Sequence, residues 1–146
     1  MAWLNFLNGL VGDLLPLLTM LGGGPPGVAR LIEEAKWKQR VVLVMAPTPS
    51  SKQPDFLQQK QLLTAASAGL SERDVLVIYR LHGELTSTEE VYLHQRYRLH
   101  VKGFEVMLIG KDGGVKLHRT QPVAPAELFG LIDQMPMRRA EMRQPR

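Results

Sequence analysis

Groups that bind small anions gather between Thr48 and Asp55, where an apolar run ends and a helix-like run begins. Backbone N–H groups at a helix start, hydroxyls and an ammonium group can surround an anion, and here the side chains would be those of Thr48, Ser50, Ser51 and Lys52. The alternative is ordinary N-capping by a serine, with a solvated lysine beside it. A nucleophilic Ser or Thr would need an adjacent base, and no histidine is close in the sequence.

Glu105 is the second candidate functional residue, because it lies at the start of the apolar run from Phe104 to Ile109. A carboxylate in a central strand needs a cationic partner, for which the candidates are Arg40, Arg73 and Lys102. A general base would need a raised pKa and a pocket. We expect a structural ion pair.

Histidine and cysteine usage argues against a metal centre and against thiol chemistry. The histidines are His82, His94, His100 and His118, and their spacing contains no His-x-x-x-His or HExxH motif. We therefore expect no metal and no cofactor, with His118 on the exposed face of a strand beside Lys116. The 146 residues include no cysteine, so thiolate nucleophiles and disulfide exchange are excluded. The absence of cysteine fits reducing and oxidising compartments alike.

Positive charge is concentrated late in the chain, whose net charge is +4. We expect a helix that starts at Pro125 and ends at Pro136, followed by a basic tail over residues 138–146. The tail arginines either offset the helix dipole or, together with Met135 and Met137, contact an acidic protein partner; they are Arg138, Arg139 and Arg143. No aromatic-rich RNA-binding signature or zinc-finger pattern accompanies the basic residues, so nucleic acid is an unlikely partner.

The first 27 residues differ from the rest of the chain. Apolar residues recur at helical spacing from Trp3 to Leu21, and Gly22–Gly27 then forms a Gly/Pro hinge. This amphipathic segment could dock on the protein's own core or a partner's, lie at a membrane surface, act in export, or be disordered. Asp13 and two asparagines argue against a membrane span.

Residues 28–137 predict one α/β domain. Helical patterns cover 28–38, 54–69, 87–99 and 125–135, and strand patterns cover 41–46, 74–79, 104–109 and 115–119. The first two strands read as buried on both faces and, joined by a helix, form a parallel βαβ unit. Ser87–Glu90 predicts a capping box, and Lys111–Gly114 predicts a hairpin turn.

The resulting order, βαβαββα, resembles the thioredoxin-like fold, a four-stranded mixed sheet between helices with the third strand antiparallel to the others. Val101–Gly113 (VKGFEVMLIGKDG) is similar to the thioredoxin segment that forms the third strand and its hairpin. Thioredoxins carry a cis-proline at the position of Glu105. Thioredoxins and peroxiredoxins carry their active cysteines in the loop that here contains Pro49–Lys52. The resemblance therefore implies the fold without the redox activity.

A more specific resemblance covers about 35–143. It rests on Gln39–Arg40, Ala46–Pro47, Arg73–Asp74, GKDGGVKL (Gly110–Leu117) and LIDQMPMRRAEMR (Leu131–Arg143). These segments resemble the family of domains of unknown function DUF4174, which occur as small bacterial proteins and in animal extracellular-matrix and sushi-repeat proteins. The resemblance implies a thioredoxin-like domain with a binding role.

Two functional hypotheses follow. The first is a non-redox binding or interaction module for a protein partner. In a variant of this hypothesis, the segment Met1–Leu21 contacts a membrane surface. The second is a cysteine-independent enzyme or small-anion-binding protein that uses the Thr48–Lys52 loop and Glu105.

Overall fold

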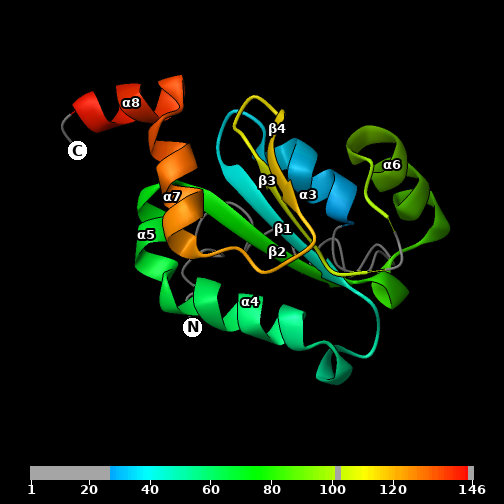
Figure 1. The fold of residues 1–146 in the computed structure, drawn as a ribbon. Helices are drawn as coiled ribbons and strands as arrows, with labels where there is room; N and C mark the ends of the chain where they lie inside the picture. The colour runs from blue at the N-terminus through cyan, green and yellow to red at the C-terminus, as the bar shows by residue number, and fades with distance from the viewer. Residues whose placement is uncertain (1–26, 101–102, 145–146) are drawn as a thin grey trace, which may run out of the picture.

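A four-stranded mixed sheet forms the centre of the molecule. The computed structural model describes residues 27–100 and 103–144. The strands lie in the order β2-β1-β3-β4, and they are β1 (Arg40–Ala46), β2 (Val75–Leu81), β3 (Glu105–Ile109) and β4 (Val115–Arg119). β1 and β2 are parallel, whereas β3 is antiparallel to both β1 and β4. Helices cover both faces of the sheet (Figure 1). The predicted thioredoxin-like α/β fold, with its order βαβαββα, is confirmed.

Two hydrophobic layers hold the helices against the sheet. On one face, α3 (Val28–Ala35) and α6 (Ser87–Tyr97) pack on alternate β1 residues, namely Val41, Leu43 and Met45. On the other face, α4 (Pro54–Ala65), α5 (Ser67–Glu72) and α7 (Pro125–Asp133) pack on Val42, Val44 and Ala46. Every residue of β1 is buried, which explains its uninterrupted apolar sequence after Arg40.

The structure corrects two predicted elements. β2 is an edge strand, and only Ile78 in it is buried, so the prediction of a strand buried on both faces was wrong for β2. The single helix predicted over 54–69 is divided at Ala66 into α4 and α5. Gly69 lies inside α5, where a Cβ atom would come within 2.7 Å of the Phe129 ring of α7. This glycine therefore permits close packing of α5 on α7.

A capping box starts α6, one residue earlier than predicted. The N-cap is Thr86, whose hydroxyl accepts a hydrogen bond from Glu89 N–H at 3.2 Å. Glu89 also accepts a 2.7 Å bond from Val28 N–H and so ties α3 to α6. Burial acts to raise the pKa of Glu89, but the hydrogen bonds from Thr86 and Val28 outweigh it and hold that pKa below its ordinary value.

The chain after α7 is helical where we expected a basic tail. α8 (Pro136–Arg143) begins at the proline that was predicted only to end the preceding helix. Proline at the first helical position has no unsatisfied N–H and a suitable φ, so it favours a new helix start. Two short 3-10 helices, η1 (Ser50–Lys52) and η2 (His82–Glu84), complete the described elements.

Some predictions concern residues outside the described ranges. These are the amphipathic segment Met1–Leu21, most of the following hinge, and Lys102 as a partner of Glu105. Within the described residues, no helix has the length and apolar content needed to cross a membrane.

Candidate functional site

The predicted anion loop lies at the carboxyl ends of β1 and β2. Thr48, Ser51 and Lys52 are exposed, and their side chains form no hydrogen bond with another described residue. α4 starts at Pro54 without a side-chain cap, so the expected capping by serine is not formed. Asp55 lies in the first turn of α4 and would oppose an anion at this helix start.

Ser50 alone among these loop residues lines a neighbouring hollow. The hollow has a volume of about 260 Å³, and its other walls are formed by Phe56, Lys60, Tyr79, Arg80, Leu81 and Glu84. Lys60 Nζ lies 5.6 Å from the centre of the Tyr79 ring. Burial raises the pKa of Tyr79, although a hydrogen bond with Thr64 opposes the rise. The phenol therefore stays protonated at neutral pH and can donate a hydrogen bond.

Glu105 is buried, with 3% of its surface exposed, and its contacts within the described residues do not include Arg40 or Arg73. Both carboxylate oxygens accept from His100 N–H, at 3.2 and 3.1 Å. His118 Nε2 lies 3.6 Å from Oε1. Arg40 and Arg73 contact other residues at the opposite end of the sheet, so they are not partners of Glu105. Among the described contacts, none joins Glu105 to the loop Thr48–Lys52.

The histidines do not assemble into a metal centre within the described part of the chain, where no group of three potential ligands is found. His94 and His100 have ring centres 5.9 Å apart, and His82 is buried with Nε2 at 3.1 Å from Gly103 O. His118 lies opposite Met107 and beside Glu105, not on an open strand face. A β-bulge near Leu108 and Ile109 breaks the strict alternation on which the prediction for His118 depended.

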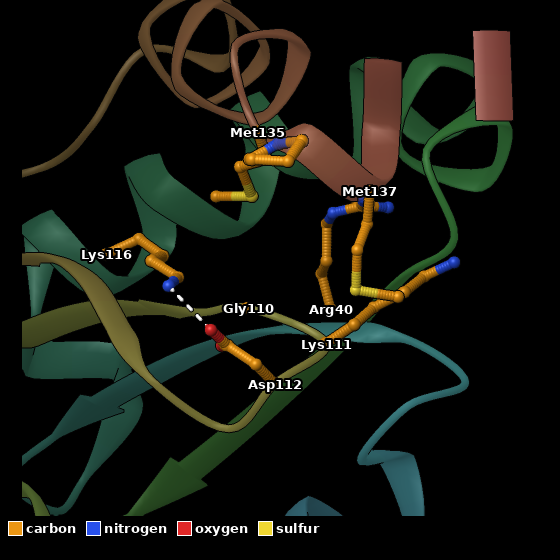
Figure 2. Close-up of a pocket in the computed structure, with 8 residues that line it drawn as sticks. Arg40, Gly110, Lys111, Asp112, Lys116, Met135 and Met137 are labelled. Atoms are coloured by element: carbon orange, nitrogen blue, oxygen red, sulfur yellow. Dashed lines mark hydrogen bonds and ion pairs between the residues drawn. The ribbon is translucent and has the colours of Figure 1, made fainter. Parts of the chain in front are cut away.

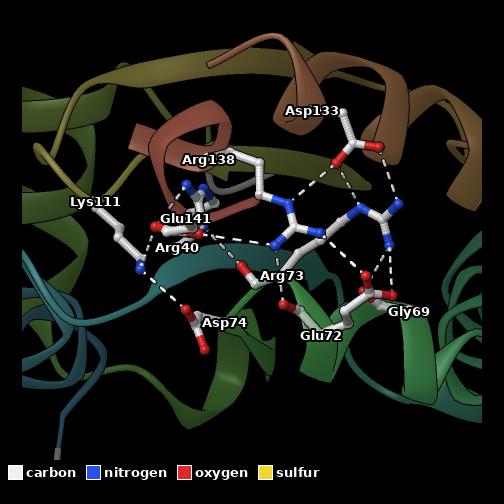
Figure 3. A network of polar contacts seen from close by, with 9 residues as sticks. All are labelled: Arg40, Gly69, Glu72, Arg73, Asp74, Lys111, Asp133, Arg138 and Glu141. Carbon is white, nitrogen blue, oxygen red and sulfur yellow. Dashed lines mark hydrogen bonds and ion pairs between the residues drawn. The ribbon is translucent and has the colours of Figure 1, made fainter. Parts of the chain in front are cut away.

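Arg40 and Arg73 belong to an ion-pair network at the amino end of β1 (Figure 3). Arg40 is 1% exposed and donates from Nη1 to Arg73 O at 2.8 Å. Its two Nη atoms also donate to the Glu141 carboxylate, at 3.2 and 3.3 Å. Lys111 binds the same carboxylate at 2.7 Å and Asp74 at 3.0 Å. Glu141 of α8 therefore joins the start of β1 to the hairpin turn.

The other half of the network joins α5 to α7 and α8. Arg73 forms two 2.9 Å hydrogen bonds with the Asp133 carboxylate, and its guanidinium lies 4.1 Å from the centre of the Phe129 ring. Arg138 contacts Asp133 and Glu72. The hydrogen bond from Arg73 is the main reason that the pKa of Asp133 lies below its ordinary value.

We define the ion-pair network as these eight residues: Arg40, Arg73, Lys111, Arg138, Glu72, Asp74, Asp133 and Glu141. Cations and anions are equal in number. Each described charge is paired within the network, which is typical of a structural element. Arg138, predicted to contact a partner, is 3% exposed and held by these internal contacts. Arg139 and Arg143 are exposed, as a partner contact would require.

An exposed tryptophan lies beside the network. Trp37 is 62% exposed and has a φ of 68°. The backbone N–H of Trp37 donates a hydrogen bond to the backbone oxygen of Lys111 at 2.7 Å. This bond holds the Trp37 backbone against the hairpin turn Gly110–Gly114. A left-handed conformation is unusual for a bulky residue and costs roughly 1–2 kcal/mol.

Exposed apolar and basic side chains also occur on the segments next to this turn, which are residues 36–38, the start of β4 and the start of α8. Val115 follows it and is 42% exposed, and Met137 at the start of α8 is 39% exposed. We call the following residues the Trp37 surface: Trp37, Val115, Met137, Lys36, Lys38, Lys116 and Arg139. Lys36, Lys38 and Arg139 form no ion pair with any residue that the structure describes. The surface therefore combines apolar anchors with uncompensated positive charge.

Sequence reasoning missed the network and, apart from Met137 and Arg139, the Trp37 surface. The network residues come from segments far apart in the chain, and only the fold joins them. Even so, seven of the eight lie in the segments on which the DUF4174 resemblance rested, Glu72 being the exception. For Trp37, the available signal was an aromatic residue between two lysines at a helix end.

Comparisons with known proteins agree with this fold. The chain is 25% identical over 142 residues to coiled-coil domain-containing protein 80 of Danio rerio, covering 81% of this chain and 16% of that protein. It is 29% identical over 129 residues to the human sushi repeat-containing protein SRPX2, covering 81% of this chain and 27% of that protein. The rat SRPX2 is 31% identical over 132 residues, with 79% and 28% covered. The chain thus spans less than a third of these relatives.

A solved structure of Plasmodium yoelii Prx1a is similar in fold, with a TM-score of 0.50 and 14% identity over 76% of this chain and 80% of that one. The profile of a domain of unknown function, DUF4174, matches residues 31–141, which include the whole ion-pair network. This chain therefore belongs to the DUF4174 family, as a thioredoxin-like member without cysteine.

Proposed function

We propose that this domain is a non-redox protein-binding module, and that it binds an acidic partner segment with apolar side chains through the Trp37 surface. The observation that carries the proposal is Trp37 itself, 62% exposed at a φ of 68°. A glycine would occupy this backbone position without strain. Retaining a large aromatic residue there is costly for stability, and such costs are concentrated at functional positions.

The chemistry of the surface defines the partner. Tryptophan and arginine are the residue types that most often dominate binding energy at protein interfaces, and methionine adapts to varied apolar partners. Unpaired Lys36, Lys38 and Arg139 favour an acidic segment and would increase its association rate. A partner with leucine or phenylalanine next to glutamate or aspartate satisfies both requirements.

The test uses the whole chain and the variant Trp37→Gly. Binding to an array of peptides that vary independently in acidic and apolar content should select acidic peptides with large apolar residues. Trp37→Gly should weaken that binding at least tenfold, while the free energy of unfolding stays unchanged or rises by up to about 1 kcal/mol.

The matched control is Leu57→Ser, which removes an apolar side chain that is 46% exposed on α4. Binding should be unchanged in this variant. Equal losses in both variants, or no preference for acidic peptides, would refute the proposal.

A second candidate function is small-anion binding in the hollow beside Ser50. Lys60, Tyr79 and Arg80 line it together with Ser50. This site keeps only Ser50 of the predicted Thr48–Lys52 loop and takes its cations from other residues. Millimolar sulfate should then raise the melting temperature of the wild type more than that of Lys60→Gln. An equal rise in both, with chloride at matched ionic strength as the reference, would eliminate this function.

A further inference from the structure

A small pocket opens between the hairpin turn and the start of α8. Its volume is about 70 Å³, several times the roughly 10–15 Å³ that one water needs. Figure 2 shows Lys116 and Asp112 on one side of it, with Arg40 beside Met135 and Met137. We call it the hairpin pocket; it is lined by Arg40, Gly110, Lys111, Asp112, Lys116, Met135, Pro136 and Met137.

Arg40 presents an unsatisfied donor in the wall of this pocket. The side chain is 1% exposed, and both Nη atoms donate to acceptors in the ion-pair network. Nε is buried and is the one guanidinium nitrogen without an acceptor among the described residues. Buried polar groups are nearly always hydrogen-bonded, so an orphaned donor beside a cavity calls for an acceptor from outside the described residues, which is either water or a ligand.

The remaining walls define what that acceptor should be. Three cationic residues, Arg40, Lys111 and Lys116, line the pocket against one anionic residue, Asp112. Both ammonium groups are already paired, Lys111 with Glu141 and Asp74 and Lys116 with Asp112. Met135, Pro136 and Met137 form an apolar wall. One unsatisfied N–H donor, an excess of cationic lining residues and an apolar wall match a single carboxylate on a short aliphatic stem.

We propose that the hairpin pocket binds such a carboxylate, through the Nε–H of Arg40. The inference rests on the proposed function, because the pocket is lined by Met137 and Lys116 of the Trp37 surface. The carboxylate could come from a glutamate of the bound partner segment or from a free short-chain organic acid. Both share the same chemistry.

The test observes the Arg40 donor directly. NMR spectra of the whole chain should show the Arg40 Nε–H resonance, and titration with butanoate should shift it with a saturable curve. Butanamide has the same stem without the charge and should leave it unmoved, as should sodium chloride at equal ionic strength. Lys116→Gln should weaken butanoate binding several-fold, whereas Arg119→Gln, at the other end of β4, should not change it.

Two further comparisons, the affinity for butanoate and a titration with peptides, identify the source of the carboxylate. Butanoate that saturates below about 1 mM indicates a free organic acid. Weaker butanoate binding, with a shift of the same resonance by a capped Leu-Glu-Leu peptide and not by Leu-Gln-Leu, indicates a partner glutamate. An Arg40 Nε–H resonance that no carboxylate moves would mean that the pocket holds only water and would overturn the inference.

Failure of this inference and failure of the proposed function can be told apart. If acidic peptides bind in a Trp37-dependent manner while the Arg40 Nε–H resonance does not shift, only the proposal that the pocket binds a carboxylate is wrong. If butanoate moves the resonance but no acidic peptide binds the Trp37 surface, the protein-binding proposal is wrong and the pocket belongs to a free organic acid.

Discussion

At the scale of single residues, Glu141 has the central structural role. Its carboxylate is 21% exposed and neutralises two buried cations, Arg40 and Lys111. Burial acts to raise the pKa of Glu141, but hydrogen bonds from Lys111 and Arg40 outweigh it and hold the pKa below its ordinary value of 4.5. The folded protein therefore depends on the ionised form of this residue.

Glu141→Gln should lower the free energy of unfolding by about 2–4 kcal/mol, because it leaves two buried cations without their shared anion. The control Glu127→Gln breaks an exposed pair with Arg119 and should cost under about 1 kcal/mol. Urea denaturation of both variants checks this. Equal losses would show that the network contributes no more than a surface ion pair.

The same substitution has a pH signature. A carboxylate with a lowered folded-state pKa stabilises the protein fully above its unfolded pKa, here 4.5, and this stabilisation is lost as the pH falls through the lower value. Wild-type stability should therefore decline below about pH 4.5, and the decline should be shallower in Glu141→Gln. If the free energy of unfolding of the two proteins falls equally steeply below this pH, the role assigned to Glu141 is contradicted.

Local sequence could not predict these residue contacts. Glu105 illustrates the reason. Its burial in a central strand followed from the apolar run around it. Its partners, however, depend on how the fold brings residues 100 and 118 next to it. Arg40 and Arg73 were chosen as its partners by charge alone. The fold instead directs them to carboxylates on α7 and α8, up to 101 residues away in sequence.

At the scale of secondary-structure elements, α8 is the main difference from expectation. The strands and most helices were predictable because β1 after Arg40 and β3 after Glu105 are uniformly apolar and because Pro54 and Pro125 mark helix starts. α8 has few apolar residues, so its polar sequence resembled a tail. Its stability in the structure comes from Arg138 and Glu141, which contact residues of other elements.

Truncation after Met135 should therefore destabilise the protein strongly. Loss of α8 removes Glu141 from Arg40 and Lys111, at a cost of roughly 3–5 kcal/mol. Truncation after Arg143 should leave stability unchanged. Thermal unfolding of the two truncated proteins provides the comparison, and an unchanged melting temperature after removal of α8 would show that α8 does not contribute to stability.

At the scale of the whole molecule, the described residues form two hydrophobic layers, one starting with Val28 and the other with Val42. Deleting residues 1–26 should therefore leave cooperative thermal unfolding intact. Circular dichroism during heating would test this, since a broad, non-cooperative transition would place the N-terminal segment in the core.

The two ends of the sheet suit different functions. The carboxyl end, where thioredoxins and peroxiredoxins carry their cysteines, here has an exposed loop without a thiol. The amino end carries the ion-pair network (Figure 3) and the hairpin pocket (Figure 2), and Trp37 is hydrogen-bonded to the same hairpin turn. We infer that the network is a rigid base for the binding surface that we propose beside it.

The most direct test of that claim is an NMR footprint of the whole chain with an acidic, leucine-containing peptide selected from the array. Binding through the Trp37 surface predicts amide shifts concentrated at residues 36–38, 110–116 and 137–143, and their loss in Trp37→Gly. Shifts concentrated at residues 48–52 and 79–84 would instead locate binding at the carboxyl end of the sheet and contradict the account.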